Sequence, residues 1–270
     1  MAQAPDRHLA RPKDAPPLAH DSAGGSATPD QDVPASEAPL VAPDELPRHV
    51  AIIMDGNRRW ARAKGLPEFE GHAAGVEAVR TLLQHAVRRG IPMLTIYAFS
   101  RENWARSDDE VAGLFDLLAR AIASETDELA AEGVRVRLLG RLEELPDDTR
   151  TAIEGALERT SGGTRLQLNV AWNYAGRTEL VDAFRRLAES GVPADQIDER
   201  AISDALYTSG LPDPDLVIRT GREQRISNFL IWQSAYAELY FADCLWPDFG
   251  PDTLDAALLE FASRTRRFGR

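Results

Sequence analysis

At three places in this 270-residue chain, an apolar run is directly followed by a segment that combines arginine with an acid or an amide. The first is "HVAIIMDGNRRWARAKG", residues 49–65, where Asp55 is followed closely by Arg58 and Arg59. Arginine side chains form charge-assisted hydrogen bonds with phosphate oxygens. A carboxylate beside a phosphate needs a cation between them, and Mg²⁺ is bound in this way by carboxylates together with substrate phosphates. The segment therefore predicts a site for Mg²⁺ and a diphosphate.

This motif has two other interpretations when it is taken alone. A surface turn with solvated charges is the more frequent meaning of a single D-G-N-x-R pattern. A phosphatase with an aspartyl nucleophile usually needs a second acid two residues later, where this chain has Asn57. The choice between these interpretations depends on the other two segments.

The second and third segments favour a site over an isolated turn. In "YAFSRENWARS", residues 97–107, an aromatic anchor and a helix cap would explain the tryptophan and the last serine, but not Asn103 together with Arg106. In "DLVIRTGREQRISNFLIWQSAYAELYF", residues 215–241, Arg219 stands at a predicted strand end and further polar residues follow. Since three strand ends offer the same kinds of side chain, we expect them to form one site.

Alternating strand and helix patterns supply the elements that must position these residues. Short apolar runs predict strands at residues 49–54, 92–98, 134–139, 165–171, 215–219 and 238–241. Helical periodicity fills the gaps, for example over 107–133, which begins with a capping box at Ser107 and Glu110, and over 146–162. This alternation predicts an α/β fold, a single domain with a mostly parallel six-stranded sheet flanked by helices. In such folds ligands bind outside the carboxyl ends of the strands.

Composition narrows the class of protein further. The formal charge is -12 and the pI is near 4.9, which argues against a general nucleic-acid-binding protein. A single cysteine, Cys244, excludes an internal disulfide framework and fits a reducing compartment. The sequence has neither an apolar run of membrane-spanning length nor a signal-peptide h-region, so a cytoplasmic location is expected. The Ala- and Pro-rich residues 1–46 predict a disordered tail before a folded domain at 47–270.

Several blocks of the sequence resemble, in order, the characteristic regions of one enzyme family. They are "HVAIIMDGNRRWA", "GH" at 71–72, "YAFSRENW", "NYAGR" at 173–177, "DLVIRT", "RISNFLIWQSAYAELYF" and "LWPDF". The family is that of the cis-prenyltransferases, which includes the undecaprenyl diphosphate synthases. The likeness extends from about residue 48 to residue 270 and leaves out the N-terminal tail.

The resemblance implies a homodimer of parallel six-stranded domains, each with a hydrophobic tunnel. It implies a transferase whose Mg²⁺-dependent reaction condenses isopentenyl diphosphate with an allylic diphosphate and gives a cis-polyprenyl diphosphate. No nucleic-acid partner is expected. Peripheral contact with a membrane through the lipid product is a further expectation.

Residue roles are carried over from the same resemblance. Asp55 would hold Mg²⁺ and assist departure of the leaving group, Asn103 occupies the position assigned to proton removal, and Glu238 would complete the metal site, across the dimer. The residues expected to bind substrate are Gly56, Asn57, Arg58, Arg59, Trp60, His72, Ser100, Arg101, Glu102, Trp104, Arg106, Arg219, Arg225, Ile226 and Ser227. Asparagine is a poor base, so a diphosphate oxygen oriented by Asn103 is an alternative proton acceptor. The sequence leaves both options open.

The chain departs from the family pattern at several positions near these residues. Glu68 stands where an arginine usually contacts the allylic diphosphate, which predicts repulsion and an altered choice of allylic substrate, unless Pro67 reshapes the loop. Arg58 and Arg222 each replace a glycine, and Gln224 replaces a frequent histidine. These departures bear on substrate and metal binding.

One further position bears on product length. Ala98 is small where short-chain members of the family carry a larger residue, which favours a medium or long product.

Two alternative functions stay open on the sequence alone. One is irregular coupling of two allylic diphosphates to a branched, lavandulyl-type product, which Glu68 keeps open. The other is a non-catalytic partner subunit, against which the retained polar residues argue.

Overall fold

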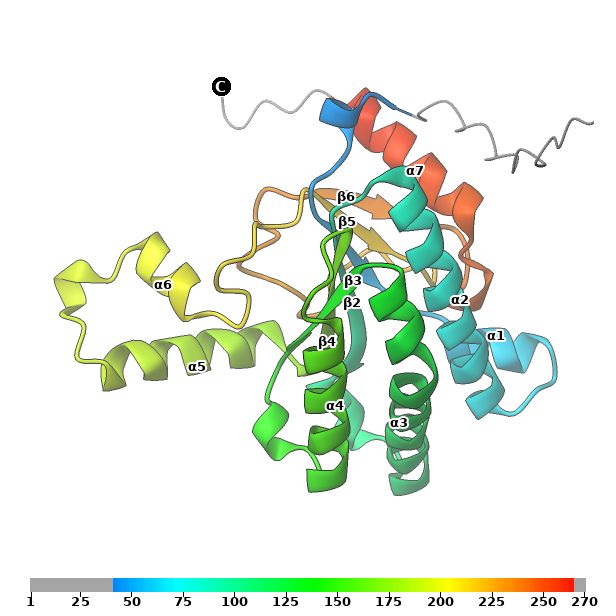
Figure 1. The fold of residues 1–270 in the computed structure, drawn as a ribbon, viewed down its shortest axis with the longest axis horizontal. Coiled ribbons are helices and arrows are strands. Elements are labelled where there is room, and N and C mark those ends of the chain that lie inside the picture. The colour runs from blue at the N-terminus through cyan, green and yellow to red at the C-terminus, as the bar shows by residue number, and fades with distance from the viewer. Residues whose placement is uncertain (1–40, 265–270) are drawn as a thin grey trace, which may run out of the picture. The chain divides into compact units, whose positions relative to one another are not determined.

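A wholly parallel, six-stranded sheet organises the computed structural model, which describes residues 41–264 (Figure 1). Its strands are β1 (Val50–Ile53), β2 (Met93–Ser100), β3 (Val134–Leu139), β4 (Leu166–Tyr174), β5 (Leu216–Arg219) and β6 (Glu238–Phe241). They lie in the order β3-β4-β2-β1-β5-β6. Each predicted strand segment corresponds to one of them, so the predicted α/β fold is confirmed.

Helices connect the strands and flank the sheet. The α-helices are α1 (Asn57–Ala63), α2 (Glu68–Arg89), α3 (Asp108–Ala131), α4 (Asp147–Thr160), α5 (Gly176–Glu189), α6 (Glu199–Ala205) and α7 (Pro251–Ser263). Short 3-10 helices cover Pro43–Glu45, Arg101–Ala105, Leu142–Glu144, Ala194–Gln196 and Trp246–Asp248. The helices predicted over 107–133 and 146–162 are therefore α3 and α4.

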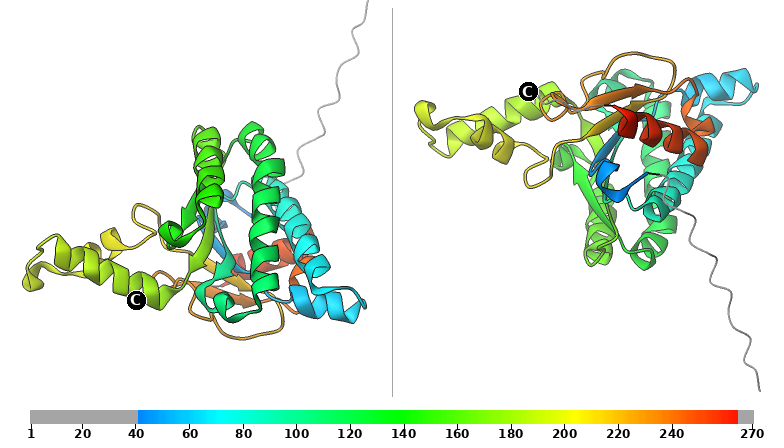
Figure 2. Two further views of the ribbon diagram at one scale, coloured as in Figure 1. Left: turned by 90° about the horizontal axis from the view of Figure 1, so that it is seen from below. Right: turned by 90° about the horizontal axis from the view of Figure 1, so that it is seen from above.

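Successive residues of a strand face opposite layers of the structure. In β1, Val50 and Ile52 pack in a core cluster with α2 and α7, whereas Ala51 and Ile53 pack on the other side with Phe229 from the segment after β5. The left view of Figure 2 shows α4, α3 and α2 standing in a row. Since β1 is buried on both faces, it appears in the sequence as an unbroken apolar run.

The order of the strands brings three polar loops together. β1 lies between β2 and β5, and all three strands run in the same direction. Ile53 of β1 is in register with Tyr97 of β2 and with Arg219 of β5, so the chain leaves the three strands at one edge. Asp55, which follows β1, and Asn103, which follows β2, are therefore placed near the end of β5.

The predicted tail falls mostly outside the part of the chain that the structure describes, as do residues 265–270 at the predicted end of the domain. Residues 41–46 contain the 3-10 helix Pro43–Glu45, and Leu46 packs against the core. Between residues 41 and 264, no helix combines the length and the apolar character needed to cross a membrane.

A buried histidine joins three strands near the amino end of the sheet. His49 Nδ1 lies 2.8 Å from the carbonyl oxygen of Pro212, and Nε2 lies 2.7 Å from Thr95 Oγ1 on β2. Because a carbonyl only accepts, Nδ1 carries the proton, and the Thr95 hydroxyl, which accepts from Asn169 on β4 at 3.0 Å, donates to Nε2. Burial lowers the pKa of His49. The folded protein therefore holds this ring neutral.

We expect His49 to make the free energy of unfolding depend on pH. Below about pH 6.5, the usual pKa of histidine, the unfolded chain takes up a proton that the folded chain does not. Stability is therefore lost as the pH falls, by about 1.4 kcal/mol for each unit of pKa shift. Denaturant titrations between about pH 5 and pH 8 should show a flatter dependence for His49→Gln than for the wild type. A difference between the two proteins that stays constant with pH would contradict this assignment.

Candidate active site

A polar cleft lies at the common edge of β1, β2 and β5. The predicted site residues that line it are Asp55, Gly56, Asn57, Arg58, Arg59, His72, Ser100, Asn103, Arg106 and Arg219. The other lining residues are Ile53, Met54, Arg62, Tyr97, Ala98 and Leu114. The structure thus unites side chains from three separate segments of the sequence, as the sequence analysis expected.

Two arginines hold the Asp55 carboxylate. Asp55 Oδ1 accepts from Arg59 Nη2 at 3.0 Å, and Oδ2 accepts from Arg219 Nη2 at 2.9 Å. Gly221 makes this close arrangement possible, since its φ is +85° and a Cβ there would lie 2.5 Å from Arg59 Nη2 and 2.8 Å from Asp55 Cγ. The carboxylate is therefore surrounded by cations that an incoming anion could also bind.

Arg219 is the deeply buried cation of the cleft, with only 4% of its surface exposed. Its Nη1 donates to the backbone oxygen of Arg225 at 2.5 Å and to Ser227 Oγ at 2.6 Å. Among the described residues, Arg219 Nε has no hydrogen-bond partner. A buried N–H group without a partner is costly. This atom is therefore available to an anion that enters the cleft.

Gly56 begins α1 in a backbone conformation that favours glycine. Its φ is +119°, and a Cβ there would lie 2.9 to 3.0 Å from atoms of Leu245. α1 itself has only seven residues, so its dipole is small and the arginines supply most of the positive charge. Trp60, a predicted substrate-binding residue on this helix, donates from Nε1 to Asp248 Oδ1 at 2.7 Å and does not line the cleft.

Glu110 of α3 faces three cationic or polar side chains of the site. Its carboxylate accepts from Arg106 Nη1 at 2.7 Å and lies 3.7 Å from His72 Nε2 and 3.9 Å from Arg58 Nη1. The predicted cap is present, since the Glu110 backbone N–H donates to Ser107 Oγ at 3.4 Å, but the carboxylate serves the site. Burial, and after it the charge of Arg106, lowers the pKa of His72. The ring is therefore neutral at pH 7.

Glu68 is paired with two arginines. Its Oε2 lies 2.7 Å from Arg58 Nε, and its Oε1 accepts from Arg62 Nε at 3.0 Å and from Arg62 Nη2. The hydrogen bonds from Arg62 and Arg58 lower the pKa of Glu68. Two departures from the family pattern, Arg58 and Glu68, thus contact each other and partly compensate. The predicted repulsion of a substrate is reduced, but two arginines that line the cleft are occupied.

The resemblance implies an allylic diphosphate as substrate, and for such a substrate we expect Glu68→Arg to lower the KM about tenfold, because the change frees Arg58 and Arg62 and adds a third cation. Steady-state kinetics with farnesyl diphosphate would measure the change. Glu68→Gln, which removes the carboxylate without adding charge, should give an intermediate KM. An unchanged KM in both variants would show that Glu68 has no part in allylic binding.

Asn103 has a defined orientation in the cleft. Its side-chain oxygen accepts from the backbone N–H of Ser100 at 3.0 Å. Since that N–H only donates, the amide atom facing it must be the oxygen. The NH₂ group is therefore the end that Asn103 can offer to a ligand.

The remaining predicted residues do not line the cleft. Next to the cleft are Arg101, Glu102, Trp104, Arg225, Ile226 and Ser227, as well as Trp60, whereas Glu238 lies at the amino end of β6 and far from it. Arg101 forms an ion pair with Glu144, and Trp104 Nε1 donates to Asn173 Oδ1 at 2.9 Å. These contacts fasten the 3-10 helix after β2 to the 3-10 helix after β3 and to the end of β4.

The segment after β5 is tied to the same 3-10 helix. Glu102 Oε1 accepts from Asn228 Nδ2 at 2.8 Å. Ser227 adjoins the cleft through its hydrogen bond with the buried arginine of β5. Ile226 packs in the apolar cluster below, and Arg225 is mostly exposed. Of the three residues that the resemblance implies for isopentenyl diphosphate, Arg219 lines the cleft, and Ser227 and the backbone of Arg225 adjoin it through hydrogen bonds with Arg219.

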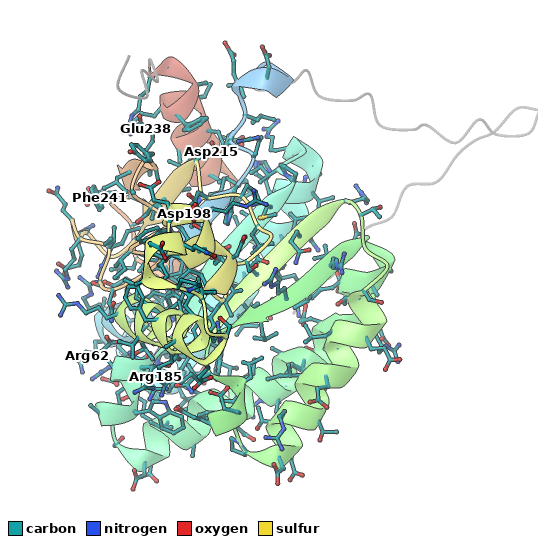
Figure 3. The ribbon with its side chains drawn as sticks, turned by 90° about the vertical axis from the view of Figure 1, so that its left-hand side faces the viewer. Arg62, Arg185, Asp198, Asp215, Glu238 and Phe241 are labelled. Carbon is teal, nitrogen blue, oxygen red and sulfur yellow. The ribbon has the colours of Figure 1, made fainter. Side chains whose placement is uncertain are left out.

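Glu238 lies away from the other predicted metal ligand. It is the first residue of β6, in register with Leu216 at the amino end of β5, whereas Asp55 lies past the carboxyl end of β1. Glu238 Oε2 accepts from Arg264 Nη1 at 2.7 Å. In Figure 3 Glu238 is labelled near the top of the view, and Arg62, from the cleft, is labelled well below it. Within one chain the two predicted metal ligands are not brought together.

The remaining departures from the family pattern lie at the edge of the site. Arg222 has a φ of +61°, the left-handed region that favours glycine, which accounts for the glycine expected there. Its guanidinium lies 3.0 Å from the Asp243 carboxylate. Gln224 is exposed. Neither side chain lines the cleft.

An apolar cavity of about 220 Å³ adjoins the cleft beneath α2 and α3. The residues that line both spaces are Met54, Asn57, His72, Ala98 and Leu114. The apolar face predicted on α3 contributes Leu118 and Ile122, and β2, β3 and β4 contribute further aliphatic side chains. The polar cleft therefore continues into an apolar space.

The donor set of the cleft suits Mg²⁺ held jointly with a phosphate. Across residues 41–264, no group of three or more His, Cys, Asp or Glu side chains is placed to hold a metal. Mg²⁺ is usually bound by one or two carboxylates plus substrate phosphates and waters, and not by a cage of protein ligands. Asp55, beside arginines that can bind phosphate, meets this requirement.

Several residues in and around this site were not among the predicted site residues. Arg62 lies one turn after Arg58 on α1, so helical spacing was a signal that could have identified it. Glu110 was recognised only as part of a cap. Tyr97 lines the cleft, and Gly221 allows the close approach to Asp55. The role of Gly221 depends on a long-range contact that leaves no local pattern.

The arginine-rich cleft at the edge of the parallel sheet continues into an apolar cavity. This arrangement defines a class of α/β proteins suited to ligands with an anionic head and an apolar tail. Comparison with known proteins identifies the family. The model of the family described as "Putative undecaprenyl diphosphate synthase" matches residues 53–269. The chain belongs to this family of isoprenyl transferases, and it is a transferase.

Individual relatives agree with this assignment. The isoprenyl transferase of Heliobacterium mobile is 49% identical over 233 residues, which cover 85% of this chain and 90% of that protein. The isoprenyl transferase of Geobacter sulfurreducens is 49% identical over 232 residues, which cover 84% of this chain and 94% of that protein. The family predicted from the sequence is therefore confirmed.

Solved structures show the same fold. The lavandulyl diphosphate synthase of Lavandula x intermedia, in complex with dimethylallyl diphosphate, has a TM-score of 0.81 at 36% identity, covering 84% of this chain and all of that one (100%). A probable undecaprenyl diphosphate synthase of Campylobacter jejuni has a TM-score of 0.71 at 33% identity, covering 83% of this chain and 99% of that one.

Proposed function

We propose that this transferase condenses isopentenyl diphosphate with an allylic diphosphate in a Mg²⁺-dependent reaction and gives a cis-polyprenyl diphosphate. The observation that carries the proposal is the continuity between the polar cleft and the apolar cavity, which share Ala98 and Leu114 among other residues. A substrate with a charged head and a growing apolar tail needs both environments side by side. The cavity would hold the tail as the hydrophobic tunnel predicted from the sequence.

The arginines of the cleft would stabilise the leaving group. An allylic diphosphate ionises only if the negative charge developing on the leaving diphosphate is neutralised. Arg58, Arg59 and Arg106 line the cleft and would bind that diphosphate, with Mg²⁺ at Asp55 acting as a Lewis acid. Because Arg59 and Arg219 both hold Asp55, a diphosphate that draws these arginines away would free the carboxylate for the metal.

The second diphosphate is proposed to bind at Arg219 and Ser227, with Arg225 at the rim. Once the new carbon–carbon bond has formed, one proton must leave the condensed chain. Asn103 accepts from Ser100 through its oxygen, so its NH₂ group would donate to a diphosphate oxygen and hold that oxygen as the proton acceptor. This orientation favours the second of the two options that the sequence left open.

Incubation of the purified protein with labelled isopentenyl diphosphate, an allylic primer and Mg²⁺, followed by sizing of the products, tests the proposal. A ladder of elongated products that disappears when the metal is chelated would support it. No incorporation with any primer would identify the non-catalytic partner subunit instead. Chain length and primer preference would follow from the same assay.

Irregular coupling of allylic diphosphates is a second candidate function. Two observations favour it, the carboxylate of Glu68 among the arginines of the cleft and the structural likeness to a lavandulyl diphosphate synthase. Supplying dimethylallyl diphosphate alone, with Mg²⁺, separates the two reactions. A branched product would establish coupling, whereas a requirement for isopentenyl diphosphate would exclude it.

We propose that the protein acts as a cytoplasmic homodimer whose contact involves the β6 edge. Tyr236, just before β6, is 79% exposed, and Leu239 and Phe241 on β6 are also exposed. In the described sheet β6 has a single neighbouring strand. An open edge with exposed apolar side chains is a surface that proteins normally cover. Glu238 lies on the same edge (Figure 3), so a metal role for it would require the partner's cleft.

Sedimentation velocity would give the oligomeric state. Flotation of the protein with lipid vesicles, with and without product, would test peripheral membrane contact.

A further inference from the structure

The cavity wall formed by α2 and α3 carries charged and polar side chains, although the cavity is otherwise mostly apolar. Arg80 and Gln84 of α2, and Glu125 and Glu128 of α3, all belong to the lining. Charged groups in an apolar wall are unfavourable unless they are paired. These four are paired across the two helices, which lie side by side (Figure 2).

Arg80 and Glu125 form the stronger of the two connections. Arg80 Nε donates to Glu125 Oε2 at 2.8 Å, and Arg80 Nη2 donates to Glu125 Oε1, so the pair is bidentate. One turn further along each helix, Gln84 Nε2 donates to Glu128 Oε1 at 3.3 Å. The hydrogen bonds from Arg80 lower the pKa of Glu125, so both groups are charged at neutral pH.

The pair stands between the cavity and the solvent, part of the way along the cavity. The Arg80 side chain is 36% exposed and that of Glu125 is 16% exposed. Arg80 follows His72 of the shared lining by eight residues on α2, which is about 12 Å along the helix axis. The pair therefore faces the tail of a bound chain and not its diphosphate head.

We propose that Arg80 and Glu125 act as a latch that fixes the distance between α2 and α3, and thereby limits the length of the product. The inference rests on the proposed chain elongation. With the latch closed, the two helices wall the cavity on this side and the tail meets a closed space. With the latch broken, the helices can separate, and the cavity accepts additional isoprene units.

An ordinary stabilising ion pair between two helices would have a different signature. Partly exposed ion pairs contribute little to stability, so removal of the latch should leave the protein folded. A structural role would alter the unfolding free energy without altering product length. The length of the longest product is therefore the measurement that separates the two roles.

The test uses Arg80→Gln, Glu125→Gln, the double variant and the charge swap Arg80→Glu/Glu125→Arg. Products are sized for each protein with the same primer, after the wild type has been shown to elongate isopentenyl diphosphate. We expect both single variants to lengthen the longest product by one or more isoprene units. The double variant should match the singles, because a latch can be broken only once. The charge swap should restore the wild-type ladder.

Arg120→Gln is the matched control. Arg120 forms an i,i+4 ion pair with Asp116 on α3, and both side chains are about 70% exposed. Neither residue lines the cavity. The control variant should leave the ladder unchanged. An unchanged ladder in the latch variants, or single variants that shift it in opposite directions, would overturn the latch while leaving elongation intact. A wild type that does not elongate would overturn the proposed function, and the latch with it.

Discussion

Asp55→Asn is expected to lower turnover about 10²- to 10³-fold, the range seen when one group that stabilises transition-state charge is removed. Asparagine keeps the size of the side chain and an oxygen that can accept from Arg59 or Arg219, so the fold should be retained. What is lost is the negative charge that would hold Mg²⁺ beside the diphosphate. Single-turnover rates with saturating substrates would measure the effect.

Binding of inorganic pyrophosphate gives a second and independent measurement on the same variant. Without Mg²⁺, pyrophosphate should bind Asp55→Asn at least as tightly as the wild type, because the arginines no longer pair with a carboxylate. With Mg²⁺, only the wild type should gain affinity. Isothermal titration calorimetry would show both effects. Asp116→Asn, at an exposed carboxylate on α3, is the control and should behave as the wild type. A variant that keeps turnover within a factor of ten would remove Asp55 from the proposed mechanism.

Ala98→Leu is expected to shorten the product by several isoprene units. Ala98 lines both the cleft and the cavity. It lies at a β-bulge, because Tyr97 pairs with Ala171 and Phe99 with Trp172, and the intervening residue is left without a partner in the ladder. Ala98 packs against the core cluster around Phe99, but it also lines the cavity, so the larger side chain has open space to enter and the stability penalty of overpacking should be small. The growing tail would then meet an obstacle at the entrance of the cavity.

The same substitution deeper in the cavity is the positional control for this prediction. Ala121 of α3 also lines the cavity and follows Leu114 of the shared lining by seven residues, about 10 Å along the helix. Ala121→Leu should therefore truncate the product later than Ala98→Leu. Chromatographic sizing of the dephosphorylated products would give both ladders. Ladders identical to that of the wild type would show that the cavity does not hold the tail.

Much of the architecture was predictable because its signals are local. The central strands appear as short apolar runs because other elements cover them, and β1 is buried on both faces. The Ser107 cap of α3 has a local sequence pattern, and the structure shows its hydrogen bond to Glu110. The resemblance in ordered blocks also identified the family, which the comparisons confirm. The general rule that ligands bind outside the carboxyl ends of parallel strands predicted that Asp55, Asn103 and Arg219 would lie at one site.

Other features depended on which distant segments come into contact. The sequence predicted that Glu68 would repel a substrate, whereas the structure pairs it with Arg58 and Arg62. It placed Glu110 in a cap only, and the carboxylate also faces the site. The sequence alone could not establish whether Glu238 shares a chain with its metal partner or faces another copy.

The sequence by itself therefore determined the elements, their α/β class, the family and most of the polar residues of the cleft. These properties are carried by apolar patterns, caps and motifs that span only a few residues. Only the tertiary structure decided the strand order, the partners of the charged residues, the bulge at Ala98 and the ion pair between Arg80 and Glu125. Those features arise when segments far apart in the chain pack together, and the pairing of one charge among many depends on that packing.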